Sequence, residues 1–118
     1  MAAPNIVNVT TITAKTTVTA LTTSLTSVLT NALNSNSVYK INSITYANYT
    51  TLPATGTATI LRSATSYYIV GNVSVPANST LIVTGKDTVF YLEEGDAIQG
   101  SASTNSALSA IISYEIIV

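Results

Sequence analysis

Four carboxylates close together in the sequence are the residues best suited to chemistry. They are Asp87, Glu93, Glu94 and Asp96. A pair of carboxylates can cleave a glycosidic bond, and a cluster of carboxylate oxygens can bind calcium. Residues 93–96, however, have the composition of a tight turn, with Gly95 where a positive φ is needed. The sequence therefore favours the solvated tip of a β-hairpin over a calcium site, and a calcium site over a catalytic pair.

The residue types that most often catalyse reactions or bind zinc are missing. The 118 residues include no His and no Cys. His is the commonest general base, and His and Cys are the usual zinc ligands. There is also no Gly-rich phosphate loop and no nucleophile elbow. We therefore expect a protein that is not an enzyme, with no catalytic residues, no metal site and no cofactor.

Charged residues are unusually scarce. Four basic and five acidic residues give a net charge of −1, and charged residues make up 8% of the chain, against roughly 25% in a typical soluble domain. No basic stripe is available to neutralise phosphates, so we expect no nucleic-acid partner. No apolar segment approaches the ~20 residues that span a bilayer, and the first residues lack a basic region before an apolar run. We expect neither a membrane anchor nor a secretion signal, and the weak self-repulsion suits ordered assembly.

Tyrosines are the other side chains with binding potential. The chain has seven, and an aromatic ring can stack on a sugar while its hydroxyl stays in water. Tyr39, Tyr46, Tyr67 and Tyr114 lie on alternating faces of expected strands, as core or interface residues would. Tyr67 and Tyr68 point to opposite faces and do not form one platform. Carbohydrate binding is therefore an alternative and not the first choice.

Four Asn-x-Ser/Thr sequons provide a further possible modification signal. They begin at Asn8, Asn48, Asn72 and Asn78. A chain so rich in Asn, Ser and Thr produces such triplets by chance. Without a secretion signal, we discount glycosylation.

The elements that must hold these residues are expected to be β-strands. β-branched residues and Tyr are abundant, whereas good helix formers are scarce. Residues 108–118 alternate most clearly, and a shift in alternation within residues 39–46 predicts a β-bulge near Asn42 and Ser43. Further strands are expected over residues 57–62, 67–75, 80–83, 89–92 and 97–102. The last two would form a hairpin through residues 93–96.

Residues 18–33 carry conflicting signals. Leu21, Leu25 and Leu29 follow helical spacing, but Thr and Ser fill the positions between them. Because Thr loses χ1 freedom in a helix, we favour a strand over residues 25–30, with one short helix as the alternative. Together the segments predict an all-β protein, a single antiparallel β-sandwich or jelly-roll-like domain of about seven to nine strands covering residues 1–118.

The last strand is the candidate interface. Residues 111–118 are apolar on both faces apart from Ser113 and Glu115, and such a strand would aggregate at an exposed edge. Either it is central in the sandwich, which we favour, or its second face, with Ile111 and Ile117, is covered by another subunit. The candidate interface residues are Ile111, Tyr114 and Ile117.

Several segments resemble small virion structural proteins of tailed bacteriophages. These are Val75-Pro76-Ala77-Asn78-Ser79-Thr80-Leu81, then Phe90-Tyr91-Leu92-Glu93-Glu94-Gly95-Asp96-Ala97-Ile98, and residues 107–115, and the likeness extends to residues 6–13 and 38–44. In those proteins a Pro-led turn, a hairpin with Glu-Glu-Gly-Asp and a closing Ser-Tyr-Glu strand recur in a β-sandwich. The resemblance covers most of the chain and brings no catalytic residue with it.

The resemblance implies a component of a virion that assembles in the host cytoplasm. A short single domain without fibre repeats is most similar to a capsid decoration, or cement, protein, which would stabilise the head lattice through apolar subunit contacts. Its partners would be the major capsid protein or other virion proteins, and further copies of itself as a homo-oligomer. A neck, tail or head-fibre protein is the alternative within the same class, because fold alone does not choose between them.

Overall fold

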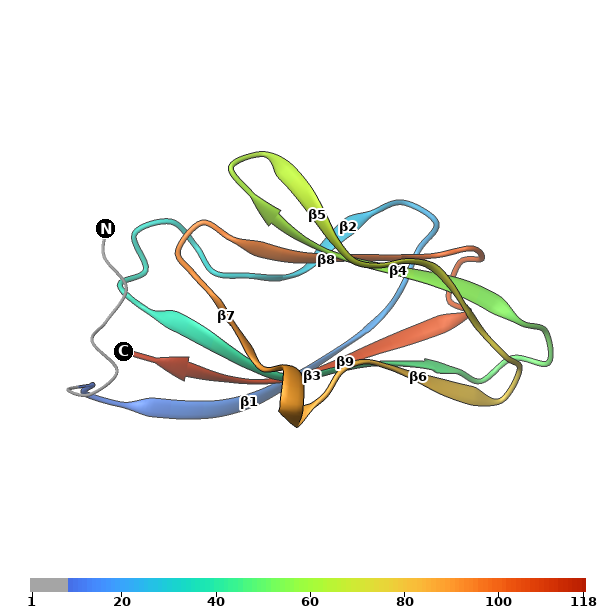
Figure 1. The fold of residues 1–118 in the computed structure, drawn as a ribbon, viewed down its shortest axis with the longest axis horizontal. Coiled ribbons are helices and arrows are strands. Elements are labelled where there is room, and N and C mark those ends of the chain that lie inside the picture. Colours follow the sequence, from blue (N-terminus) through green and yellow to red (C-terminus); the bar gives the residue numbers. More distant parts are fainter. Residues whose placement is uncertain (1–8) are drawn as a thin grey trace.

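The computed structural model describes residues 9–118, which form an antiparallel β-sandwich (Figure 1). Its strands are β1 (Ile12–Ala20), β2 (Thr26–Thr30), β3 (Val38–Asn48), β4 (Ala54–Arg62), β5 (Thr65–Val75), β6 (Ser79–Thr84), β7 (Phe90–Leu92), β8 (Ala97–Ala102) and β9 (Leu108–Ile117). A single turn of 3-10 helix, η1 (Lys86–Thr88), precedes β7. The predicted all-β class and sandwich architecture are confirmed.

The strands divide into two sheets. The first sheet has the order β1-β9-β3-β6, with β7 also paired to β3, and the second sheet has the order β2-β8-β4-β5. Figure 1 shows the two sheets as two layers, one above the other. Alternating residues of both sheets meet between the layers and form the core.

β9 is central in the first sheet, because β1 pairs with one of its edges and β3 with the other. Leu108, Ala110 and Ile112 point into the core and are buried, as the alternation predicts. The bulge in β3 is confirmed as well, because the pairing of β3 with β9 shifts between Ile41 and Ser43. Both successes rest on the same signal, the strict two-residue period of a half-buried strand.

Residues 18–33 contain strands and no helix. β1 runs to Ala20, and β2 begins at Thr26, so the strand expected over residues 25–30 is confirmed and the helical alternative is wrong. The helically spaced leucines have separate roles. Leu21 is buried in the core at the end of β1, whereas Leu29 lies on β2 and packs against the core from the second sheet. Thr-rich sequence between them favours extended backbone.

The expected hairpin through residues 93–96 is wrong. β7 pairs with β3 in the first sheet, whereas β8 pairs with β2 and β4 in the second sheet. The turn therefore crosses from one layer to the other. It crosses because Leu92 at its start and Ile98 after its end are both fully buried, each pointing into the core from its own sheet. Gly95 has a φ of 84°, as expected for the turn.

Tyr46 on β3 spans the core between the two sheets and contacts β4 on the other side. Its ring is fully buried, and its hydroxyl donates a hydrogen bond of 2.9 Å to the carbonyl of Thr57. A Cβ atom at Gly56 would come within 2.8 Å of the ring, and one at Gly100 within 2.8 Å of the hydroxyl. Both positions therefore require glycine. Burial raises the pKa of Tyr46 above its usual value.

Candidate functional site

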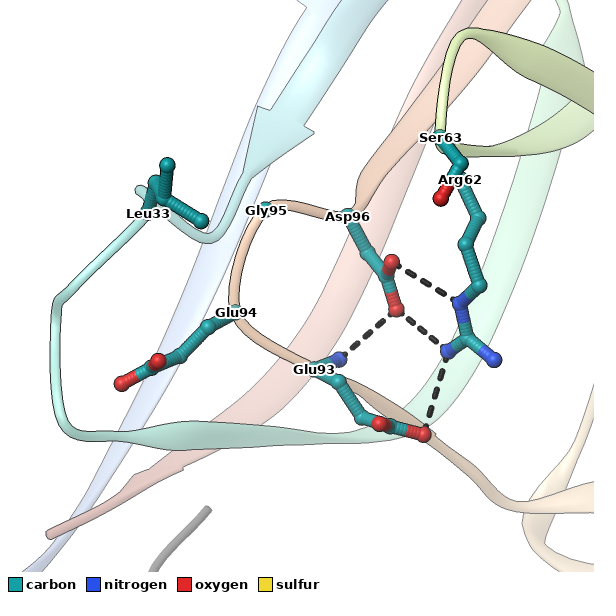
Figure 2. A pocket seen from close by; sticks show the side chains of 7 residues that line it. All are labelled: Leu33, Arg62, Ser63, Glu93, Glu94, Gly95 and Asp96. Atoms are coloured by element: carbon teal, nitrogen blue, oxygen red, sulfur yellow. Dashed lines mark hydrogen bonds and ion pairs between the residues drawn. The ribbon is translucent and has the colours of Figure 1, made fainter. Parts of the chain in front are cut away.

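The acidic turn between β7 and β8 holds an ion pair between the buried Asp96 and the partly exposed Arg62 (Figure 2). Asp96 is 2% exposed, and its carboxylate accepts hydrogen bonds from Arg62 Nε at 2.9 Å and Arg62 Nη2 at 2.5 Å. The backbone N–H of Glu93 donates to the same carboxylate at 2.9 Å. Hydrogen bonding to Asp96 raises the pKa of the Arg62 guanidinium. The expectation that the turn is solvated is therefore wrong for Asp96. The cost of removing its carboxylate from water is offset by two hydrogen bonds from Arg62.

The register of the second sheet explains why these two residues meet. Leu61 on β4 pairs with Ala97 on β8, so Arg62 and Asp96 occupy the next positions along adjacent strands. Glu93 lies 3.2 Å from Arg62 with its side chain 59% exposed, and Glu94 accepts a hydrogen bond from the backbone N–H of Asn36. Within residues 9–118, no three or more carboxylates are grouped as metal ligands. The carboxylates act here as structural hydrogen-bond acceptors.

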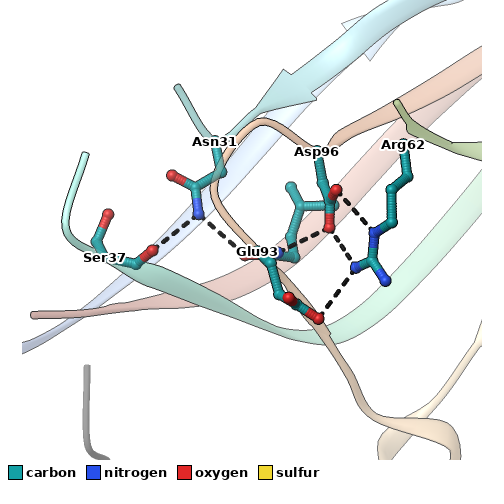
Figure 3. Close-up of polar contacts among 6 residues, drawn as sticks. Asn31, Ser37, Arg62, Glu93 and Asp96 are labelled. Atoms are coloured by element: carbon teal, nitrogen blue, oxygen red, sulfur yellow. Dashed lines mark hydrogen bonds and ion pairs between the residues drawn. The ribbon is translucent and has the colours of Figure 1, made fainter. Parts of the chain in front are cut away.

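Asn31 forms hydrogen bonds with both this turn and the segment before β3, a role that sequence reasoning missed (Figure 3). The side chain is fully buried and donates hydrogen bonds of 3.0 Å to the carbonyls of Ser37 and Leu92. Its backbone N–H donates to the carbonyl of Asp96, and its carbonyl accepts from Gly95. A lone Asn in a polar segment carries no pattern that would have predicted this role.

Two shallow hollows flank Arg62. One, of about 350 Å³, lies over the acidic turn between Leu33 and Ser63. The other, of about 290 Å³, is lined by Ile60, Arg62 and Tyr67. Tyr67 is 59% exposed and gives the second hollow one aromatic wall beside a cation. This is the arrangement in the described residues that best fits the carbohydrate alternative.

The three candidate interface residues lie in three different environments. Ile111 is 37% exposed on the outer surface of the first sheet. Tyr114 is 8% exposed and faces inward, where its ring stacks on Tyr39 with centroids 5.4 Å apart. Ile117 is 5% exposed. Its neighbour Ile116 is partly buried and packs against the core, so the two-residue alternation of buried and exposed side chains breaks down at the end of β9. The favoured interpretation of the sequence, a central strand, is therefore confirmed. The alternative, one outer face shared by Ile111 and Ile117, is wrong, because Ile111 alone of the three is exposed.

Ile111 belongs to a row that crosses the outer surface of the first sheet. It pairs with Val18 on β1 and with Thr45 on β3, and Thr45 pairs with Ile82 on β6. Val18 and Ile82 are each 68% exposed. Directly opposed residues point to the same side of a sheet, so these four side chains form one band.

The neighbouring rows carry small uncharged residues. One row contains Ala20, Ser109, Ala47 and Thr80, and the other contains Thr16, Ser113 and Ser43. We call these three rows together the apolar face. These three rows contain no charged residue, although six of their eleven residues are Ser or Thr and the next row along the sheet carries Glu115 and Lys40. Sequence reasoning could identify only Ile111 among them, because the rest follows from the register of four separate strands.

The sequons differ in accessibility. Asn48 is fully buried, and its amide donates hydrogen bonds of 3.0 Å to the carbonyls of Leu52 and Val75, so this side chain is not open to glycosylation. Asn72 and Asn78 are exposed, with positive φ angles of 50° and 55°. Asn8 lies outside the described residues.

Comparison with known proteins gives no family assignment. No family model and no curated protein matches the chain. Among residues 9–118 no helix is long and apolar enough to cross a membrane. Function must therefore be inferred from the fold and from the surfaces described above.

Proposed function

We propose that this chain is a non-enzymatic structural protein of a virion, a capsid decoration protein that binds the major capsid protein and stabilises the head lattice. The observation that carries the proposal is the apolar face, three rows of uncharged residues on the outside of the first sheet, with Val18 and Ile82 each 68% exposed. Such a surface fits another protein surface better than a small ligand, which needs a concave site. The resemblance to small phage virion proteins supports the same class.

The exposed apolar side chains are enough for weak attachment by each copy. Fully burying an Ile or Val side chain contributes about 1.5–3 kcal/mol. Val18, Ile82 and Ile111 are 68%, 68% and 37% exposed, so covering all three contributes roughly 3–5 kcal/mol. A contact of this size is weak for one molecule, but it is sufficient where many copies bind neighbouring sites on a lattice.

The proposal is tested first by copy number. Virions that carry the protein should contain it in an amount comparable with the major capsid protein, measured by quantitative mass spectrometry of purified particles. A few copies per particle would instead favour a neck, tail or head-fibre protein. Absence from purified particles would overturn the virion role.

The surface is tested by a matched pair of substitutions. Ile82→Lys places a charge on the apolar face, whereas Tyr68→Lys places one on the second sheet at a side chain with nearly the same exposure, 67%. We expect Ile82→Lys to weaken binding to particles stripped of the protein, and Tyr68→Lys to leave it unchanged. Wild-type attachment should survive high salt, because screening weakens ion pairs and leaves apolar burial intact. Equal binding by both variants would refute the use of this face.

A carbohydrate-binding module is the second candidate, supported by the exposed ring of Tyr67 beside Arg62 in the hollow of about 290 Å³. An array of glycans probed with the isolated chain tests it directly. Binding that is lost in Tyr67→Ala and kept in Ile82→Lys would favour this function over the decoration role.

A further inference from the structure

β1 is an edge strand that differs from the other edges of the sandwich. It pairs with β9 over all nine of its residues, and this pairing has no register shift. Among residues 9–118, no strand pairs with its other edge. Its only charged residue is Lys15, and it contains no Pro. These are the properties of an edge that accepts another strand.

The remaining edges are short or irregular. β2 has five residues and a register shift, β6 has six residues and a register shift, and β7 has three residues. β5 is longer, with eleven residues, but its pairing with β4 shifts twice. Short and bulged edges resist pairing with another strand. Within the described part of the chain, β1 is therefore the edge best able to pair.

The outward-facing backbone groups of β1 follow from its bonds to β9. Thr11 and Val118 exchange both backbone hydrogen bonds, and the N–H of Leu21 donates to the carbonyl of Leu108. Hydrogen-bonded residues alternate along an antiparallel strand, so the odd-numbered residues of β1 bond to β9. The even-numbered residues therefore direct their N–H and C=O groups away from the sheet. They are Ile12, Ala14, Thr16, Val18 and Ala20.

We propose that β1 pairs antiparallel with β1 of a second copy, centred on Thr16, and forms a two-fold dimer with one continuous sheet. In this register Thr16 faces Thr16, and Ala14 faces Val18 of the other copy. Every outward-facing backbone group of the strand then meets an outward-facing group, so the full ladder forms.

Lys15 helps to select this register. A dimer centred on Lys15 would place two lysines directly opposite each other, which is unfavourable. Centring on Thr16 instead places Lys15 opposite Thr17. Because the pairing uses the same edge on both copies, the assembly closes as a dimer and does not extend into a fibre. The dimer does not depend on the proposed virion role, because it requires only the free edge of β1 and can be tested with the isolated chain.

Single cysteines test the register, because the natural chain has no Cys. In Thr16→Cys the two introduced residues would be a hydrogen-bonded pair, with Cα atoms about 5.5 Å apart, which a disulfide spans. In Ala14→Cys they would lie four positions apart along the strand, about 14 Å. We expect mild oxidation to cross-link Thr16→Cys but not Ala14→Cys alone. A mixture of Ala14→Cys and Val18→Cys should cross-link, because these residues face each other.

Thr16→Pro tests the pairing itself. It removes an outward-facing N–H and leaves the bonds between β1 and β9 in place, so the fold should persist. We expect light scattering to give twice the 12.2 kDa chain mass for wild type, and Thr16→Pro to weaken dimerisation by about tenfold or more. Thr16→Lys, which sets two lysines opposite each other, should do the same if the Pro variant does not fold. A wild-type monomer at all concentrations, or equal cross-linking of Thr16→Cys and Ala14→Cys, would overturn the proposal.

Discussion

Replacing Asp96 with Asn tests whether the ion pair in the turn between β7 and β8 stabilises the sandwich. The substitution keeps the size and shape of the side chain and removes its charge. The oxygen of the introduced amide, in the place of Oδ2, could still accept hydrogen bonds from the N–H of Glu93 and from Arg62 Nη2. The amide nitrogen, in the place of Oδ1, would point a donor at the donor Nε of Arg62. The variant therefore removes the hydrogen bond of 2.9 Å from Arg62 Nε and the negative charge that strengthens the contact of 2.5 Å with Nη2.

The expected cost follows from the geometry. A hydrogen bond to a charged group contributes about 1.5–3 kcal/mol when it is protected from water. The side chain of Arg62 is 47% exposed, so water can replace part of the hydrogen bonding that the guanidinium loses. We therefore expect the free energy of unfolding to fall by about 2–3 kcal/mol in total. For 118 residues the unfolding entropy is about 250 cal/mol/K, so the melting temperature should fall by about 8–12 °C.

The assay is thermal unfolding followed by circular dichroism, with urea unfolding at 25 °C as an independent measure of the free energy of unfolding. Glu93→Gln is the matched control, because Glu93 belongs to the same turn but is 59% exposed and makes one contact of 3.2 Å with Arg62. An exposed pair of this kind contributes about 0.5 kcal/mol or less, so the control should shift the melting temperature by about 2 °C at most.

The contrast between the two variants decides the question. If Asp96→Asn melts within about 2 °C of the wild type, then the buried carboxylate does not stabilise the turn and the reasoning fails. If both variants lose several degrees, the turn responds to net charge and not to the buried contact. A loss confined to Asp96→Asn supports the ion pair.

Three further predictions concern other buried positions. Ile117→Lys should unfold the domain or cost about 3 kcal/mol or more, whereas Ile111→Lys should stay within about 1 kcal/mol of wild type, as judged by urea unfolding. Asn48→Ala should cost about 2–4 kcal/mol, because the carbonyls of Leu52 and Val75 lose their donor; an unchanged urea midpoint would contradict this. Burial raises the pKa of Tyr46 above its usual value of 10.0, so the folded state retains a proton that the unfolded state releases, and stability should fall as the pH rises above 10. Tyr46→Phe should make that decline shallower in melting curves at pH 9 and pH 11, and an equal slope would count against this assignment.

The strands could be predicted because a half-buried strand has a two-residue period that is visible in one sequence. The alternation from Leu108 identified β9, and the break in alternation near Asn42 identified the bulge where the pairing of β3 and β9 shifts. Both are local signals. They need no knowledge of which strands are neighbours.

The partition of strands between sheets could not be predicted in the same way. Gly95 marks a turn whether the flanking strands pair with each other or enter different sheets, so the sequence around it is compatible with both. The outcome is decided by distant partners, β3 for β7 and β4 for β8. The burial of Asp96 follows from that partition, because its partner Arg62 lies 34 positions away in the sequence.

The apolar face and the free edge of β1 have a joint consequence if both proposals hold. A two-fold axis perpendicular to the sheet would place the apolar faces of the two copies on the same side of one continuous sheet. Each face alone offers Val18, Ile111 and Ile82 as its large apolar side chains, a contact of only a few kcal/mol. Joining two such faces makes the second contact intramolecular, which increases attachment without any new residue. Scarce charge on the face and an unblocked edge at β1 would then serve one purpose, the accumulation of weak contacts on a repeating protein surface.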